Sequence, residues 1–217
     1  LNNSNLLKDK MFSVIAHDLR NSLGNFSNTL EIINTPEGVS QSEKEELLNL
    51  LNELSKSTYH LLENLLNWSL SHRGIIDFNP IPLNIKPIID DIIYQAKPTA
   101  DKKSIIIHQR ITEDLWIQAD VNMAKTIFRN LIGNAIKFTP RDGKVFISAK
   151  PINNFIEFSI QDTGIGMSDE TIKKLFTRID FKTTFGTNNE QGSGLGLMLC
   201  KDFVEKNGGT IWVNSSV

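Results

Sequence analysis

Four short stretches of the sequence hold side chains whose types and spacing could do chemistry, and the first surrounds His17. It lies in a helix-like run, with Asp18 next to it and Asn21 one turn further along the same face. A neutral imidazole is a competent nucleophile near pH 7, and a neighbouring carboxylate raises its basicity and can take its proton. We interpret His17 as a candidate nucleophile with Asp18 as its base. A solvent-exposed histidine without a role is the simpler alternative.

The second stretch places Asn130, Asn134 and Lys137 at positions i, i+4 and i+7 of a predicted helix, and therefore on one face. Amide oxygens can bind Mg²⁺ and an ammonium group can bind phosphate oxygens, so this face suits a magnesium-bound triphosphate. An ordinary polar face on an amphipathic helix is the alternative.

The third stretch is a glycine motif that follows a predicted strand. Asp162 precedes Gly164 and Gly166. A carboxylate can accept a hydrogen bond from the exocyclic amine of adenine, and the two glycines let a ligand approach the backbone closely. The motif therefore indicates an adenine pocket, although a simple turn also accounts for two spaced glycines.

The fourth stretch, 192–197, alternates glycine with other residues directly before a predicted helix; it contains Gly192, Gly194, Leu195 and Gly196. Such a loop directs backbone N–H groups at an anion and indicates phosphate binding. It lacks both the spacing of a dinucleotide fingerprint and the Gly-Lys-Ser/Thr of a P-loop. A flexible hinge is the alternative.

A polar stretch rich in Thr and Asn separates the two glycine motifs, at 176–191. A loop of this length in a compact domain is usually functional or disordered. We interpret it as a lid over a nucleotide, with Arg178 and Lys182 as candidate phosphate contacts. For both residues, solvated surface charge is the alternative.

Two regions with different periodicity must position these residues. From about 5 to 72, apolar residues recur at three- and four-residue steps, which predicts two amphipathic helices broken at 35–38. The second helix is expected to begin after Ser40 or Ser42, with acidic residues in its first turn. An antiparallel hairpin cannot bury both apolar stripes by itself, so residues 1–73 are expected to dimerise as a four-helix bundle.

Residues 74–82 contain Gly74 and Pro80 and are predicted to be a linker. Beyond it, 83–217 alternates helix and strand signals, so the predicted fold class is α+β, with a mixed sheet covered by helices on one face. A turn at Asn153-Asn154 is expected to form a hairpin. Strands are expected at 105–111, 115–119, 144–152, 155–161 and 210–213, and helices at 88–100, 123–138, 169–176 and 196–207.

Composition excludes some classes of protein. The 23 Lys and Arg residues are balanced by 25 Asp and Glu residues, which does not favour binding to nucleic acid or to an anionic membrane. Cys200 is the single cysteine, which fits a reducing, cytoplasmic compartment. No run of about 18 apolar residues occurs. Both ends look cut, so we expect a longer parent protein, and a span in the inner membrane with this region on the cytoplasmic side is compatible with the sequence.

Taken in order, the motifs resemble those of the sensor histidine kinase family over nearly the whole chain. The matching residues are 17–20 for the family's H box, 130–137 for its N box, 162–166 for its first glycine box, Phe176 and Phe181 for its F box, and 192–197 for its second glycine box. Five motifs in the family's order are far more specific than any one of them.

The resemblance implies a dimeric helical hairpin joined to an α/β sandwich of the Bergerat (GHKL) type, the ATP-binding fold shared with gyrase and Hsp90. By this resemblance Asn134 would bind Mg²⁺, Asn130 and Lys137 would lie near the phosphates of ATP, and Asp162 would bind the adenine amine. The pocket and the hinges of the lid would be shaped by Gly164, Gly166, Gly192, Gly194 and Gly196.

The resemblance also implies a reaction. The γ-phosphoryl group of ATP would move to a ring nitrogen of His17 and then to an aspartate in the receiver domain of a response regulator. In this family the residue four past the histidine can position a water that dephosphorylates the regulator, and Asn21 is chemically able to do so.

The chain departs from the family's pattern at two points. Ser22 stands where the family usually has a proline, so the helix keeps an N–H there and should bend less. The last strand of the sandwich is expected to be missing beyond Val217.

Two other functions stay open at this point. One is a GHKL-type ATPase clamp, which hydrolyses ATP without phosphorylating itself; the hairpin that carries His17 and Asp18 argues against it. The other is a scaffold that binds ATP and a partner without transfer; Asn134, Asp162 and the glycine motifs argue against that.

Overall fold

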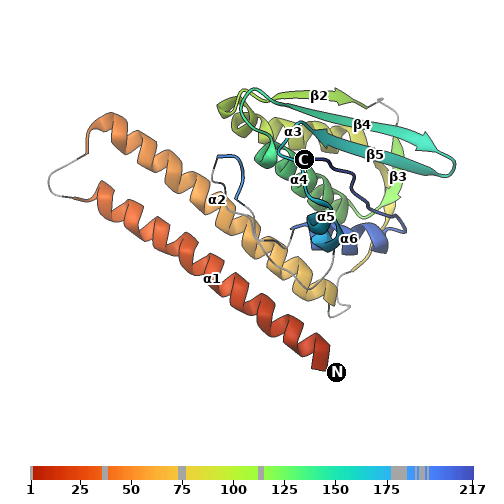
Figure 1. The fold of residues 1–217 in the computed structure, drawn as a ribbon, viewed down its shortest axis with the longest axis horizontal. Coiled ribbons are helices and arrows are strands. Elements are labelled where there is room, and N and C mark those ends of the chain that lie inside the picture. Colours follow the sequence, from red (N-terminus) through yellow and green to blue (C-terminus); the bar gives the residue numbers. More distant parts are fainter. Residues whose placement is uncertain are drawn as a thin grey trace. The chain divides into compact units, whose positions relative to one another are not determined.

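Two long helices precede a region of mixed helices and strands, and the chain divides between them into the units Leu1–Ile76 and Asp77–Val217. The structure, a computed structural model, describes residues 2–35, 39–72, 77–111, 115–176, 185–188, 190, 194 and 196–217 (Figure 1). In the first unit, α1 (Asn2–Ile33) and α2 (Gln41–His72) pack against each other as an antiparallel hairpin. The predicted helical hairpin is confirmed.

The start of α2 is fixed by a reciprocal pair of hydrogen bonds. The backbone N–H of Glu43 donates to Ser40 Oγ at 3.3 Å, and Ser40 N donates to Glu43 Oε2 at 2.9 Å. This capping box satisfies two helix-terminal N–H groups that would otherwise lack partners. Of the two caps predicted from the sequence, Ser40 and Ser42, the structure shows Ser40 in this role.

The hairpin leaves much of its apolar surface uncovered. Among its described side chains, the buried residues are Thr29, Leu51, Leu61 and Asn64. The large apolar side chains that remain exposed are Leu23, Leu30, Ile32, Leu48, Leu50, Leu62 and Leu66. No helix in the described ranges has the length and apolar character needed to span a membrane.

The second unit contains two small sheets and four helices within its described residues. Strand β1 (Ile81–Asn84) pairs antiparallel with β3 (Trp116–Ala119). In the other sheet β4 (Lys144–Ile152) lies in the centre, parallel to β2 (Ile106–Arg110) and antiparallel to β5 (Phe155–Asp162). The helices are α3 (Ile85–Lys102), α4 (Val121–Phe138), α5 (Asp169–Leu175) and α6 (Gly196–Lys206). The predicted α+β class is confirmed.

Three details of the predicted fold are wrong. The strands form two sheets and not one, because β1 gives β3 a partner outside the larger sheet. Strand β1 begins at Ile81, within the range predicted as a linker, and Pro82 is tolerated there because β1 is an edge strand. Residues 210–213 are not a strand: their exposure alternates as in one, but no strand of the described part pairs with them.

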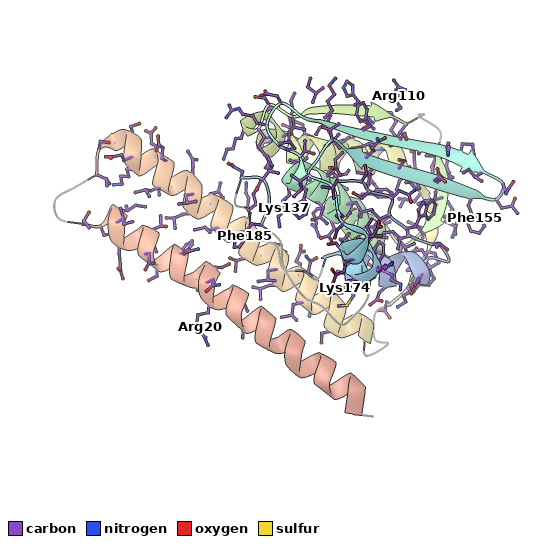
Figure 2. All side chains as sticks on the ribbon, in the orientation of Figure 1. Arg20, Arg110, Lys137, Phe155, Lys174 and Phe185 are labelled. Carbon is purple, nitrogen blue, oxygen red and sulfur yellow. The ribbon has the colours of Figure 1, made fainter. Side chains whose placement is uncertain are left out.

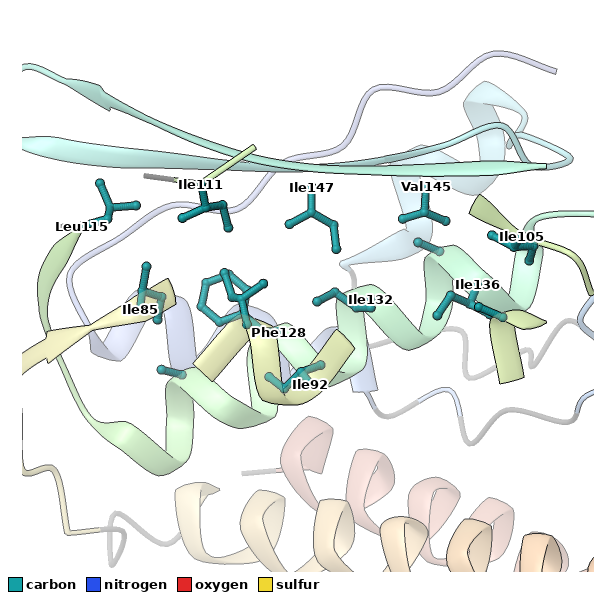
Figure 3. Packing of buried hydrophobic residues seen from close by; sticks show 14 residues of the cluster. Ile85, Ile92, Ile105, Ile111, Leu115, Phe128, Ile132, Ile136, Val145 and Ile147 are labelled. Atoms are coloured by element: carbon teal, nitrogen blue, oxygen red, sulfur yellow. The ribbon is translucent and has the colours of Figure 1, made fainter. Parts of the chain in front are cut away.

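The core of the second unit lies between the larger sheet and helices α3 and α4 (Figure 3). Val145 and Ile147 point from β4 towards the helices, where they meet Ile132 and Ile136 of α4. These four side chains are at most 2% exposed. Burial of each such side chain contributes about 1.5–3 kcal/mol, so this contact fixes α4 firmly against the sheet.

Helix α4 is central to the unit because it packs on two other helices as well as on the sheet. It contacts α3 and α6, and Cys200 of α6 donates to Ile127 O at 3.7 Å. Burial raises the pKa of the Cys200 thiol to about 12, so this cysteine is a packing residue. One helix therefore holds the sheet and the two neighbouring helices in fixed positions.

The N-terminus of α4 is held by Asp120, which is 7% exposed. Its Oδ1 accepts from the backbone N–H groups of Asn122 at 2.9 Å and Met123 at 3.0 Å. Its Oδ2 accepts from Asn79 N at 3.2 Å, and Asn207 Oδ1 accepts from Asp120 N at 2.9 Å. Asp120 thus joins the start of the second unit, α4 and the end of α6.

We expect Asp120→Ala to lower the free energy of unfolding of the second unit by about 2 kcal/mol, because it removes a helix cap and leaves buried N–H groups without an acceptor. Urea unfolding followed by circular dichroism and tryptophan fluorescence measures the change. The control is Asp101→Ala, an exposed residue in the last turn of α3, which should change stability by no more than about 0.5 kcal/mol. Equal effects of the two substitutions would contradict the role given to Asp120.

Candidate active site

The polar residues predicted on α4 lie along its boundary with the core. Asn130, Asn134 and Lys137 are each half-buried, whereas Ile132 and Ile136, on the core side, are buried. The helix thus presents an apolar side to the sheet and a partly covered polar side elsewhere. Two amides and an ammonium group on that polar side can bind a metal ion and phosphate oxygens.

Asn130 connects α4 with the start of α6. Its Nδ2 donates to Thr126 O at 2.8 Å, which leaves Oδ1 directed towards Gly196, the first residue of α6. A Cβ atom at Gly196 would overlap Asn130 Oδ1. Gly196 therefore permits close approach of the helix that follows the second glycine motif, and an amide oxygen lies next to a helix N-terminus, where anions bind well.

Asp162 and Gly164 lie at the other end of α4. Asp162 Oδ1 accepts from Gly164 N at 2.8 Å, and no described residue donates to its Oδ2. Ile165 N donates to Phe138 O at 3.2 Å, which ties the first glycine motif to the last residue of α4. The exposed carboxylate is thus held by its own loop through Oδ1, and among the described residues its Oδ2 has no donor.

Gly164 is needed at this contact for a steric reason. A Cβ atom there would overlap Asp162 Oδ1 and lie 2.6 Å from Phe138 O. A backbone carbonyl cannot move aside as a flexible side chain can. Gly166 and Gly194 are required for a different reason, since each has a φ of +67°, in the left-handed region that favours glycine.

Gly164→Ala is expected to weaken binding of an ATP analogue by at least about tenfold, because the added methyl group displaces Asp162 or separates the loop from α4. Isothermal titration calorimetry measures the affinity. The matched control is Gly133→Ala, also next to the polar face, where a Cβ atom meets nothing within 4 Å. That control should bind normally and gain up to about 1 kcal/mol of helix stability. Equal affinities of the two variants would refute the steric argument.

Lys137 lies at the C-terminal end of α4 and faces the loop that carries Phe185 and Gly186 (Figure 2). Its Nζ lies 4.9 Å from the centroid of the Phe138 ring. Burial lowers the pKa of the Lys137 ammonium group, and the nearby Glu190 carboxylate opposes this shift by favouring the charged form. The positive charge of Lys137 is therefore partly shielded from water, where it attracts an anionic ligand more strongly.

The structure gives less information about several of the predicted site residues. The predicted residues that lie outside the described ones are Arg178, Phe181, Lys182, Gly192 and Leu195. Phe176 is half-buried and ends α5, and its role stays a prediction.

In the hairpin, the backbones of His17 and Asp18 belong to α1, but their side chains are outside the described set. Asn21, one turn further, is half-buried, and Arg20 is exposed (Figure 2). The structure therefore does not test His17 as the nucleophile or Asp18 as its base, and both roles stay predictions.

Two residues near Lys137 were not predicted from the sequence. Lys103 and Glu190 form an ion pair with 3.1 Å between Nζ and Oε1. Lys103 is one of two adjacent lysines at the end of a helix, and Glu190 is one acid in a polar loop. Nothing local distinguishes them, because their contacts join parts of the chain far apart in sequence.

Comparison with known proteins identifies relatives of the chain. Residues 119–217 match the family described as histidine kinase-, DNA gyrase B-, and HSP90-like ATPase. The whole chain is 30% identical to hybrid signal transduction histidine kinase C of Dictyostelium discoideum, of which it spans 18%. It is 29% identical over 97% of its length to the adaptive-response sensory kinase SasA of Gloeothece citriformis, of which it spans 55%. The chain thus corresponds to part of each relative.

Solved structures agree with this. The catalytic domain of histidine kinase ThkA, at 29% identity and a TM-score of 0.54, covers 63% of this chain, and the match covers 88% of that domain. ThkA in complex with the response regulator protein TrrA matches 97% of this chain and 59% of its own, with a TM-score of 0.70 and 20% identity. Because the second match is only 20% identical, it shows a shared fold and nothing further.

Proposed function

We propose that this chain, which carries the catalytic core of a histidine kinase, is an ATP-dependent protein histidine kinase that phosphorylates His17. Its residues 119–217 match the histidine kinase-, DNA gyrase B-, and HSP90-like ATPase family. The observation that carries the proposal is that two glycine motifs and the loop between them all contact α4. The first glycine motif contacts Phe138, Gly196 contacts Asn130, and the loop before the second motif contacts Lys137.

The proposed nucleotide lies along the polar side of α4. Asp162 accepts from the adenine amine through Oδ2, since its Oδ1 already accepts from Gly164. Lys137 binds phosphate oxygens, and backbone N–H groups at the start of α6 bind them as well. Adenine and phosphates are then held at separate points, which fixes the orientation of the γ-phosphoryl group.

Mg²⁺ fits this site because it binds hard oxygen donors, commonly one or two from protein together with phosphate oxygens and water. Asn134 would supply its amide oxygen, and Asn130 Oδ1, which is directed towards Gly196, is a second oxygen in the same region. When bound, the ion neutralises charge that develops on the phosphates during transfer. The protein residues supply orientation and exclude water.

In the proposed transfer a ring nitrogen of His17 attacks the γ-phosphorus of ATP, the N–P bond forms, and the bond to the ADP oxygen breaks. ADP leaves with that electron pair, and Asp18 takes the imidazole proton. The phosphoryl group then passes to an aspartate in the receiver domain of a response regulator. In the opposing activity, Asn21 positions a water that hydrolyses the phosphoryl group from the aspartate of that regulator.

The proposed working unit is a homodimer formed by the hairpin, in the cytoplasm. The support is the exposed apolar side chains of α1 and α2, such as Leu23 at 60% and Leu66 at 59% exposure. A second hairpin would cover them in a four-helix bundle. For this chain, dimerisation and the response regulator are part of the proposal.

The proposal is tested by incubating the chain with Mg²⁺ and γ-labelled ATP and following both label and ATP consumption. Label on the protein that is lost in acid and kept in base supports a phosphohistidine. ATP turnover without label would favour the ATPase clamp, and nucleotide binding with neither would favour the scaffold.

A further inference from the structure

Lys103 is a buried ammonium group that the proposed reaction does not use. It is 5% exposed, at the C-terminal end of α3. Its Nζ lies within hydrogen-bonding distance of Ile136 O at 3.0 Å, Lys137 O at 2.9 Å, Thr187 Oγ1 at 2.6 Å and Glu190 Oε1 at 3.1 Å. Four acceptors surround three N–H donors, so the group is fully satisfied.

These acceptors belong to two different parts of the molecule. The two carbonyl groups belong to the last turn of α4, where the helix carries partial negative charge and a cation is favourable. Thr187 and Glu190 belong to the segment between the glycine motifs. Lys103 therefore connects the end of the helix that bears Lys137 with the chain that leads to the second glycine motif.

The described residues 185–188 and 190 of this segment make further contacts around this connection. Thr187 N donates to Lys137 O at 3.1 Å, and Thr187 Oγ1 donates to Thr139 O at 2.8 Å. Glu190 O accepts from Gly186 N at 2.8 Å, and Glu190 Oε2 accepts from Asn188 N at 2.8 Å. The carboxylate thus joins its own turn through one oxygen and Lys103 through the other.

We propose that Lys103 and Glu190 form a clasp: positioning residues that hold Gly186, Thr187 and Asn188 against the end of α4 and so keep Lys137 and the described glycines of the second glycine motif, Gly194 and Gly196, in place for phosphate. This inference rests on the proposed function for its nucleotide, whereas the contacts of the clasp exist without one. Neither residue touches the reacting atoms in this proposal.

Two distances show why the clasp matters to the ligand. A Cβ atom at Gly186 would lie 2.6 Å from Lys137 Cγ, so this turn packs directly on the lysine stem. Glu190 precedes Gly194 by four residues, so the chain can extend at most about 14 Å between them. Release of the clasp would free both phosphate-binding elements together.

The charge of Glu190 is consistent with this arrangement. Burial acts to raise the pKa of the carboxyl group, but hydrogen bonds from the backbone N–H groups of Glu190 and Asn188 and from Lys103 outweigh it, and the pKa is lowered. The carboxylate therefore stays ionised while it is partly covered, which keeps the ion pair charged on both sides.

The first test follows the clasp without nucleotide. Amide hydrogen exchange of the full chain is compared with that of Lys103→Met and Glu190→Gln. Exchange of the Gly186 and Thr187 amides should become faster by about tenfold, as expected when a charged hydrogen bond of the segment is lost. The matched control is Lys102→Met, which removes the adjacent, exposed lysine and should leave this exchange unchanged. Unchanged exchange in both clasp variants would overturn the clasp.

The second test measures affinity for a non-hydrolysable ATP analogue with Mg²⁺, alongside the melting temperature. Both clasp variants should bind about tenfold more weakly, with Lys102→Met normal. A lowered melting temperature with affinity within twofold of the original would mean a purely structural role and would overturn the proposal. If Lys103→Met does not fold, Glu190→Gln decides by the same criteria. Failure of the unchanged chain to bind the analogue would instead refute the proposed function, and the positioning role with it.

Discussion

Replacing His17 by glutamine is expected to reduce phosphorylation of the chain by ATP to background, a loss of roughly a thousandfold or more. Glutamine keeps a polar side chain on α1 but has no nitrogen lone pair that can attack phosphorus. Binding of ATP should be unchanged, because every residue of the proposed nucleotide site lies in the second unit. The measurement is protein-bound label after incubation with γ-labelled ATP, combined with calorimetric affinity for an ATP analogue.

A second histidine serves as the matched control. His108 lies on β2, exposed, with its ring stacked on Phe146 at 4.9 Å between centroids. His108→Gln should retain full phosphorylation. Label that persists in His17→Gln, or that disappears equally in both variants, would show that His17 is not the acceptor.

Replacing Asn134 by alanine is expected to weaken magnesium-dependent nucleotide binding by roughly a hundredfold. The amide oxygen is the proposed protein ligand, and alanine offers nothing in its place. Phosphorylation of His17 should fall to a similar degree, since the phosphates are no longer oriented. In the presence of a chelator, both proteins should bind the nucleotide equally and weakly.

Affinity for the nucleotide analogue is measured with and without Mg²⁺, because a metal ligand affects binding only when the ion is present. Asn122→Ala is the control, because Asn122 is exposed in the first turn of the same helix, away from the motifs. It should retain normal affinity. If Asn134→Ala binds the analogue normally in magnesium, its metal role is wrong.

The periodicity of the sequence was sufficient for most elements, and the exceptions have one cause. The β4–β5 hairpin and its Asn153-Asn154 turn follow from local residues, as does α4. The pairing of β1 with β3 joins residues far apart, and the false strand at 210–213 has the right residues but no partner. Local pattern predicts that a segment can be extended, whereas a strand exists only when another chain segment bonds to it.

The candidate site divides in the same way. Asn130, Asp162 and Gly164 were identified because their types and spacing are unusual, and the structure adds the reason for the glycine, which is the carbonyl of Phe138. Lys103 and Glu190 could not be identified, since each is an ordinary charged residue until the fold brings them together across 87 positions of sequence. Spacing reveals residues that share one element, but not a contact between distant ones.

The central place of α4 has a thermodynamic consequence. The same helix buries Ile132 and Ile136 in the core and presents Asn130, Asn134 and Lys137 on its other side. Unfolding of this helix would disrupt both the core and the proposed ligand site. Occupancy of the site by ligand and the global stability of the unit are therefore linked through mass action. A saturating ligand is expected to raise the melting temperature of the whole second unit, and conversely a cavity made in the core is expected to reduce apparent affinity without touching the ligand.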